Sequence, residues 1–155
     1  MTGRLVAIYV APAASVPMEA RDRVDVVAGV GLQGDRYATA TGTYSGFGTD
    51  ARDVTLIERE AVDAVRVEDG GIDVREELTR RNLVTEGVAL NHLVGRTFRV
   101  GEVRMRGVRL AEPCAYLEQL TALPGVREAF EHRGGLRAEI LDDGELRVGD
   151  TVDAS

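Results

Sequence analysis

The sequence predicts a mainly β domain with peripheral helices, an α+β arrangement in which short strands form a barrel-like sheet. Three observations favour this class. Apolar and polar residues alternate in several short runs, turn residues separate these runs at short intervals, and the segments with helical spacing are all brief. With 155 residues, the chain is expected to form one domain, over residues 1–155, with a core of its own.

The first elements follow from local pattern. Residues 4–11 (RLVAIYVA) predict a buried strand that ends at Pro12. The glycine-rich stretch at 29–48 predicts tight turns and close approach of the backbone. Residues 53–58 (DVTLIE) predict a second strand, which leads into a helix over 59–68 because its apolar residues have helical spacing.

The middle of the chain predicts two more helical segments. Asp73 as N-cap and Glu76 three residues later form a capping-box pattern, which predicts a helix that ends near Arg80. Residues 91–95 (NHLVG) predict one further helical turn. Alternating apolar residues and arginines over 97–110 then predict a strand meander with turns at Gly101-Glu102 and at Gly107.

The last part of the chain predicts helices followed by strands. Residues 115–121 and 125–132 predict two short helices, the second of which ends at Gly134-Gly135. Residues 136–153 predict a closing hairpin around Asp143-Gly144.

Composition excludes several function classes. The net charge of −7 argues against nucleic-acid binding, which needs a basic surface. All 19 cationic side chains are arginines, so the chain has no lysine to form a Schiff base with pyridoxal phosphate or to complete a P-loop. The single cysteine excludes an internal disulfide and a CxxC pair, and His92 and His132 lack partners at metal-ligand spacing. We expect a cytoplasmic protein without a membrane partner, because neither a signal peptide nor a long apolar run is evident.

Cys114 is the first candidate for chemistry. Pro113 suits the first position of a helix, so Cys114 is expected in the first turn, where the helix dipole favours a thiolate and lowers the thiol pKa below its usual value of about 8.5. Arg109 just upstream adds positive charge. The alternative is a structural cysteine packed in the core, and local sequence leaves both interpretations open.

Two further motifs carry charged or polar groups. In GLQGDRY, Gly34 allows a tight loop and Asp35 and Arg36 place opposite charges together; the alternative is a turn with a solvated ion pair. In TRRNLV, the adjacent Arg80 and Arg81, with Asn82, could bind an oxyanion through paired hydrogen bonds; the alternative is a helix C-terminus that carries cations suited to its dipole.

The order of these motifs resembles the MOSC domain, which is named after the C-terminal domain of molybdenum-cofactor sulfurases. The resemblance covers about Val30 to Leu120, with the last predicted hairpin also fitting, and is greatest to the stand-alone bacterial members. It rests on four segments in this order: GLQGDRY, RDVTLIE, RRNLVTEGVALNHLVGRTFRVGEV and GVRLAEPC. It implies a barrel-like, mostly β fold with peripheral helices, as the strand pattern does.

The resemblance also implies a site and a cofactor. The family's cysteine corresponds to Cys114, which would accept sulfur as a persulfide or ligate molybdenum in the molybdenum cofactor (molybdopterin). The other residues that correspond to the cofactor pocket, or add charge to it, are Gly34, Asp35, Arg36, Arg81, Asn82 and Arg109.

Three functions remain open on this basis. The first is a sulfur carrier supplied by a cysteine desulfurase. The second is a molybdenum-dependent reductase of N-hydroxylated compounds with an external electron-donor protein, and the third is a non-catalytic binding module.

In the sulfurases, the persulfide arises on a separate pyridoxal-phosphate domain, and the amidoxime reducers carry an additional N-terminal barrel. A lysine-free chain of 155 residues is expected to contain neither, so its donor must be another molecule. The oligomeric state is not indicated.

Overall fold

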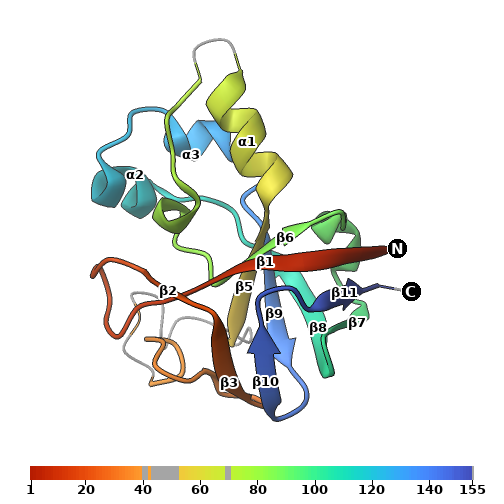
Figure 1. Cartoon of the computed structure of the whole chain (residues 1–155). Coiled ribbons are helices and arrows are strands. Elements are labelled where there is room, and N and C mark those ends of the chain that lie inside the picture. Colours follow the sequence, from red (N-terminus) through yellow and green to blue (C-terminus); the bar gives the residue numbers. More distant parts are fainter. Residues whose placement is uncertain (40–41, 43–52, 69–70, 155) are drawn as a thin grey trace.

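The computed structural model describes residues 1–39, 42, 53–68 and 71–154 (Figure 1). Within this part of the chain, seven strands close into a barrel, because β11, the first strand of the sheet order, also pairs with β1, the seventh. Six of the seven neighbouring pairs are antiparallel, and β5–β6 is parallel. The strands, in order around the barrel, are β1 (Thr2–Val10), β11 (Thr151–Asp153), β7 (Thr97–Val100), β8 (Val103–Leu110), β9 (Leu136–Ile140), β5 (Val54–Glu58) and β6 (Leu83–Glu86).

A smaller sheet and one edge strand extend the barrel. Strand β2 (Glu19–Arg21) pairs with the far part of β1. Strands β10 (Gly144–Arg147), β3 (Arg23–Val27) and β4 (Gly31–Leu32) form a separate three-stranded antiparallel sheet.

The helices gather at one end of the barrel, at the top of Figure 1. They are α1 (Arg59–Val67), α2 (Ala115–Thr121) and α3 (Val126–Ala129). The structure also has two 3₁₀ turns, η1 (Glu76–Thr79) and η2 (Leu90–Leu93), and η2 contacts the barrel strands β5, β8 and β9. Helix α1 lies in the connection between β5 and β6, as a parallel strand pair requires. No helix in the described residues is long and apolar enough to span a bilayer.

Two apolar clusters hold the fold together. The barrel interior is filled by residues from the strands, among them Leu5, Leu56 and Met105, all fully buried. The second cluster lies between the outer face of the barrel and the helices, and Ile57 and Val84 belong to it. Strand β5 is therefore buried on both faces, which explains why its residues are apolar or small instead of alternating with charges.

Much of the element pattern predicted from sequence is confirmed. The strand at 4–11, the strand and helix over 53–68, the helical turn near 91–95 and the turn at Gly101-Glu102 are all present. Both short helices after Cys114 form, although the second ends at Ala129, earlier than predicted. Most of the glycine-rich stretch beyond residue 39 lies outside the described residues.

The predicted capping box at Asp73 is wrong. Residues 71–75 form no helix: Val74, which is fully buried, donates its amide to Ile72 O at 2.8 Å, Arg75 is extended, and the helical segment is only the 3₁₀ turn η1. Its N-cap is Arg75, which makes no side-chain capping bond. Burial of Val74 thus outweighs the local capping preference of the exposed Asp73.

Two predicted turns in the second half are also wrong. Gly107 does not end a strand: β8 continues through it with a register shift, and a Cβ there would lie 2.1 Å from the Leu93 carbonyl oxygen. Glycine is required at this position by close backbone approach. The hairpin around Asp143-Gly144 does not form either, because β10 leaves β9 and pairs with β3.

Candidate functional site

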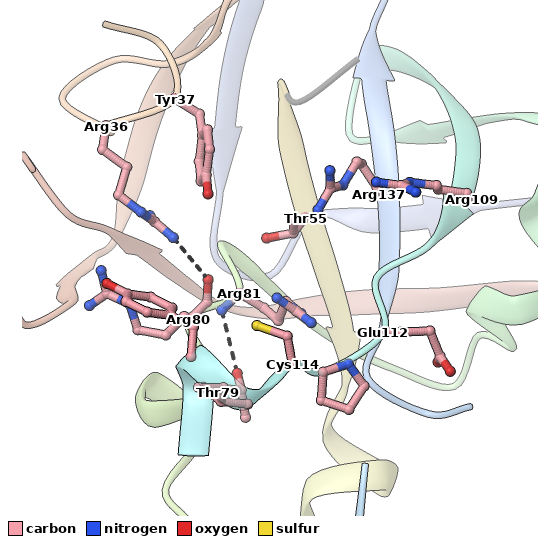
Figure 2. A pocket seen from close by; sticks show the side chains of 13 residues that line it. Arg36, Tyr37, Thr55, Thr79, Arg80, Arg81, Arg109, Glu112, Cys114 and Arg137 are labelled. Carbon is pink, nitrogen blue, oxygen red and sulfur yellow. Dashed lines mark hydrogen bonds between the residues drawn. The ribbon is translucent and has the colours of Figure 1, made fainter. Parts of the chain in front are cut away.

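A pocket of about 250 Å³ lies where the strands β5, β8 and β9 meet the loops before β6 and α2 (Figure 2). Its described lining contains five arginines, one carboxylate and the thiol of Cys114. In a chain of net charge −7, this is a local concentration of positive charge. The lining residues are Arg36, Tyr37, Thr55, Thr79, Arg80, Arg81, Arg109, Glu112, Pro113, Cys114, Tyr116, Leu117 and Arg137.

Arg81 is held in place by two backbone carbonyls. Its Nε donates to Gly134 O at 2.7 Å and its Nη2 to Ala111 O at 2.6 Å. Gly134 permits this, since a Cβ there would lie 2.5 Å from the same Ala111 oxygen. Burial, and then the nearby charge of Arg137, lowers the pKa of Arg81 to about 10, while the negative form of Cys114 opposes this shift. Arg81 thus remains a cation at neutral pH, and its charge would stabilise a Cys114 thiolate.

Arg36 is fixed by the carboxylate that precedes it. Asp35 is completely buried, and its Oδ1 accepts from Arg36 Nη1 at 2.9 Å and from Ala11 N at 3.1 Å. The other oxygen of Asp35 accepts from Tyr37 N at 3.2 Å. The guanidinium of Arg36 also lies 4.7 Å from the centre of the Tyr37 ring, a cation–π distance.

Arg80 connects the Arg36 side of the pocket to the N-terminal loop. It ends η1 in the left-handed conformation, with φ 65°. Its carbonyl accepts from Arg36 Nη2 at 3.3 Å, and its own Nη1 donates to the Val16 carbonyl. Burial and the charge of Arg36 lower the pKa of Arg80. A left-handed arginine costs on the order of 1 kcal/mol, which the surrounding hydrogen bonds offset.

Three neighbouring strands form the opposite wall. Thr55 on β5 is paired in register with Arg137 on β9, which is paired in register with Arg109 on β8. The register therefore places two arginines side by side on this wall. The hydroxyl of Thr55 faces inward to Asn82, to which it donates at 3.2 Å, so the donors that this wall offers to a ligand are the guanidinium groups.

Cys114 lies between two groups of arginines, Arg36 with Arg80 and Arg109 with Arg137. Its sulfur points toward Arg81 in Figure 2. It is half-buried. The prediction that Cys114 lies in the first helical turn is wrong by one position: it is the N-cap of α2, with extended backbone, and its carbonyl accepts from Leu117 N at 3.1 Å. Since α2 has only seven residues, the positive environment of the thiol comes chiefly from the arginines.

The structure brings together five of the residues singled out from the sequence, Arg36, Arg80, Arg81, Arg109 and Cys114. The other three do not line the pocket. Gly34 lies in an exposed turn with φ +86°, Asp35 supports Arg36 from behind, and Asn82 is buried and bonded to Thr55 and to the Tyr9 carbonyl.

Sequence reasoning missed several lining residues, including Arg137 and the tyrosines. Tyr37 had a usable signal, because it is adjacent to Arg36, which was selected. Arg137 had none, because its place opposite Arg109 depends on the pairing of β8 with β9, which no local pattern in either segment specifies.

A closed barrel that places one thiol in a pocket of arginines defines a domain suited to bind an anion beside that thiol. The chain belongs to the MOSC domain family, since the family model matches residues 43–153, well over half of its length. This family is associated with the molybdenum cofactor.

Solved structures show the same fold at low identity. The YuaD protein from Bacillus subtilis is similar with a TM-score of 0.78 and 17% identity, covering 98% of this chain and 94% of that one. YiiM from Geobacillus stearothermophilus gives a TM-score of 0.73 and 12% identity, covering 99% and 75% of the two chains. YiiM from Escherichia coli gives 0.67 and 17%, covering 98% and 69%. No curated protein matches the chain.

The donor set fits the family's cofactor. The molybdenum cofactor carries a phosphate, which arginine binds through paired hydrogen bonds, and a soft metal centre, which suits a thiolate ligand. Arginines of the pocket would hold the phosphate and Cys114 would face the metal end. Among residues 1–39, 42, 53–68 and 71–154, no group of three histidines, cysteines or carboxylates could hold a metal ion by itself.

Proposed function

We propose that this chain is a sulfur carrier that works with the molybdenum cofactor: Cys114 accepts a sulfur atom as a persulfide and presents it in the arginine pocket. The observation that supports this is the location of a half-buried thiol in one pocket with five arginines. Positive charge favours the thiolate, which is both the nucleophile and the sulfur acceptor. A purely structural cysteine would have no need of such surroundings.

The accepting step can be written without an added oxidant. The Cys114 thiolate attacks the outer sulfur of a persulfide on a cysteine desulfurase. An S–S bond forms at Cys114, the donor's S–S bond breaks, and the donor cysteine leaves as a thiolate. The chain contains no lysine, so it depends on such a donor and does not make the sulfur by pyridoxal-phosphate chemistry.

Within the chain, the residues around Cys114 have separate tasks. Arg81, fixed by two carbonyls, keeps a positive charge beside the thiolate. Arg36 and Arg80, coupled through the Arg80 carbonyl, form one anion-binding side, and the strand wall with Arg109 and Arg137 forms the other.

A second candidate is a molybdenum-cofactor-dependent reductase of N-hydroxylated compounds. The size of the pocket favours it, because about 250 Å³ with five arginines exceeds what one transferred sulfur atom needs. In that case Cys114 would ligate the metal, and a flavin or iron–sulfur protein would supply electrons.

One preparation distinguishes the two. The protein is purified from a host that makes molybdenum cofactor, and molybdenum and pterin are measured per chain, for wild type and Cys114→Ala. A separate sample is treated with a cysteine desulfurase and cysteine, and bound sulfur is located by mass spectrometry. A persulfide confined to Cys114 supports the carrier. Stoichiometric metal that is lost in Cys114→Ala supports the reductase, and a thiol that reacts only after unfolding contradicts both.

A further inference from the structure

The cations of the pocket extend well beyond the immediate neighbourhood of the thiol. A persulfide on a partner protein brings only a small charge to Cys114. The strand wall, however, places Arg109 and Arg137 in register on neighbouring strands, and both line the pocket. The planar donors of guanidinium groups match the oxygens of an oxyanion.

We propose that the pocket also accepts sulfur from a small oxyanion, an S-sulfonate such as thiosulfate, which makes the chain a thiosulfate sulfurtransferase. The sulfonate oxygens bind the Arg109–Arg137 wall, and the sulfane sulfur points to Cys114. This inference rests on the proposed function in that it uses the same Cys114 persulfide, and it names a small-molecule class of donor.

The dimensions of the pocket agree with this ligand. A cavity of about 250 Å³ is several times the ~30 Å³ that one water molecule occupies in the liquid, so it admits a compact dianion with accompanying water. The strand wall and Cys114 both belong to the lining of this cavity, so an anion bound in it shares one space with the thiol (Figure 2).

The wall supplies donors and few acceptors. Thr55, which is paired in register with Arg137 on this wall, already donates its hydroxyl proton to Asn82 Oδ1. The only carboxylate among the described lining residues is the exposed Glu112. The pocket therefore selects for an anion with several acceptor oxygens and not for a neutral ligand that must donate.

The transfer balances without a further reagent. The Cys114 thiolate attacks the sulfane sulfur of thiosulfate, and a Cys114–sulfur bond forms. The S–S bond of thiosulfate breaks, and its electron pair leaves with sulfite. Charge is conserved, since a monoanion and a dianion become a persulfide monoanion and the sulfite dianion.

The arginines reduce the repulsion between the two reacting anions, the Cys114 thiolate and thiosulfate. A cleft lined by one sign of charge concentrates the opposite ion and screens repulsion within it. Arg81, bound to the Gly134 and Ala111 carbonyls, is placed to stabilise the thiolate. Arg109 and Arg137 are placed to receive the charge that develops on the departing sulfite.

The test uses the reduced full chain and thiosulfate, with no desulfurase present. Sulfite release is measured together with the mass of the protein, and cyanide is then added as an acceptor so that turnover appears as thiocyanate. Wild type is expected to release one sulfite per chain, to gain one sulfur atom at Cys114 and to form thiocyanate continuously. Cys114→Ala is expected to do none of these.

The anion subsite is tested by Arg109→Gln and Arg137→Gln, with Arg106→Gln as the matched control. Arg106 is an exposed arginine of the same strand that does not line the pocket. Each pocket variant is expected to raise the KM for thiosulfate roughly tenfold or more, as loss of a charge-assisted hydrogen bond implies, and the control is expected to match wild type. Arg109 is exposed, so Arg109→Gln carries the test if Arg137→Gln fails to fold.

The outcomes separate this inference from the proposed function. If desulfurase loads Cys114 but thiosulfate gives neither sulfite nor bound sulfur, the inference is overturned and the carrier remains. Thiosulfate turnover that is unaffected by both pocket variants also overturns it, because the arginines would then have no part in binding. If neither donor loads Cys114, both proposals fail.

Discussion

Asn82 provides the sharpest test of how this site is supported. Its side chain joins three strands: Oδ1 accepts from Thr55 N at 3.1 Å and from Thr55 Oγ1 at 3.2 Å, and Nδ2 donates to Tyr9 O at 3.1 Å. Asn82 is 1% exposed, so water cannot replace these bonds without a change of structure. We therefore assign it to holding β5 against β1 and β6, behind the pocket, and not to ligand contact.

The variant Asn82→Ala tests this assignment through the free energy of unfolding. It leaves two backbone groups without their partners, the Thr55 amide and the Tyr9 carbonyl, and both belong to buried strands. An unpaired buried polar group costs about 1–3 kcal/mol, so the free energy of unfolding is expected to fall by roughly 2–6 kcal/mol. Because this is a large part of the stability of a typical domain, the variant is expected to unfold at a clearly lower urea concentration.

Urea unfolding followed by circular dichroism measures the effect, and Asn91→Ala is the matched control. Asn91 is exposed and makes one side-chain bond, to the His132 carbonyl at 2.8 Å, so its loss is expected to change stability by less than about 0.5 kcal/mol. The assignment is refuted if Asn82→Ala is as stable as the control but loses thiosulfate or cofactor binding, since Asn82 would then contact ligand directly.

Three further predictions follow from the charged groups. Asp35→Asn leaves the buried Arg36 without its carboxylate and is expected to lower the free energy of unfolding by about 3–5 kcal/mol in the same urea assay; a loss below about 1 kcal/mol contradicts this. Burial raises the pKa of Asp53 above its usual range, so the stability it contributes is present in acid and is lost as pH rises through that raised pKa. Asp53→Asn should therefore be stabilised at neutral pH relative to wild type and show a flatter plot of Tm against pH, and parallel plots would refute this. Because burial and Arg137 lower the pKa of Arg81 to about 10, sulfate binding measured by calorimetry is expected to weaken above that pH, and binding that stays constant through it counts against the role of Arg81.

Periodicity in the sequence predicted the barrel strands, because the apolar and polar residues along a strand reflect which of its side chains are buried. Strand β7 and the first part of β8 alternate buried and exposed residues, and this alternation is visible without any partner. The failures came where distant backbone decided the local shape. Gly107 was interpreted as a turn, but the strand continues there because residues 93–96 approach it closely. The Asp143-Gly144 pair was interpreted as a hairpin, but β10 finds its partner in β3, over a hundred residues away.

The candidate site also has a part that the sequence predicted and a part that needed the tertiary structure. Cys114, Arg36 and Arg81 could be selected because each stands in a motif whose order along the chain resembles the MOSC domain. Their common pocket could not be derived, since it depends on how three strands and two loops meet. Nor could sequence separate the residues that face the pocket from Asp35 and Asn82, which stand directly beside them in the chain and support them from behind.

The sequence by itself determined the fold class, the family and the candidate thiol, because composition, periodicity and motif order are properties of the chain alone. It also determined a negative result: without lysine, the chain cannot form a Schiff base with pyridoxal phosphate. Only the tertiary structure decided the electrostatic setting of Cys114. The arginines that surround it lie on separate elements, and charges act through distance in space, which strand pairing sets and sequence separation does not.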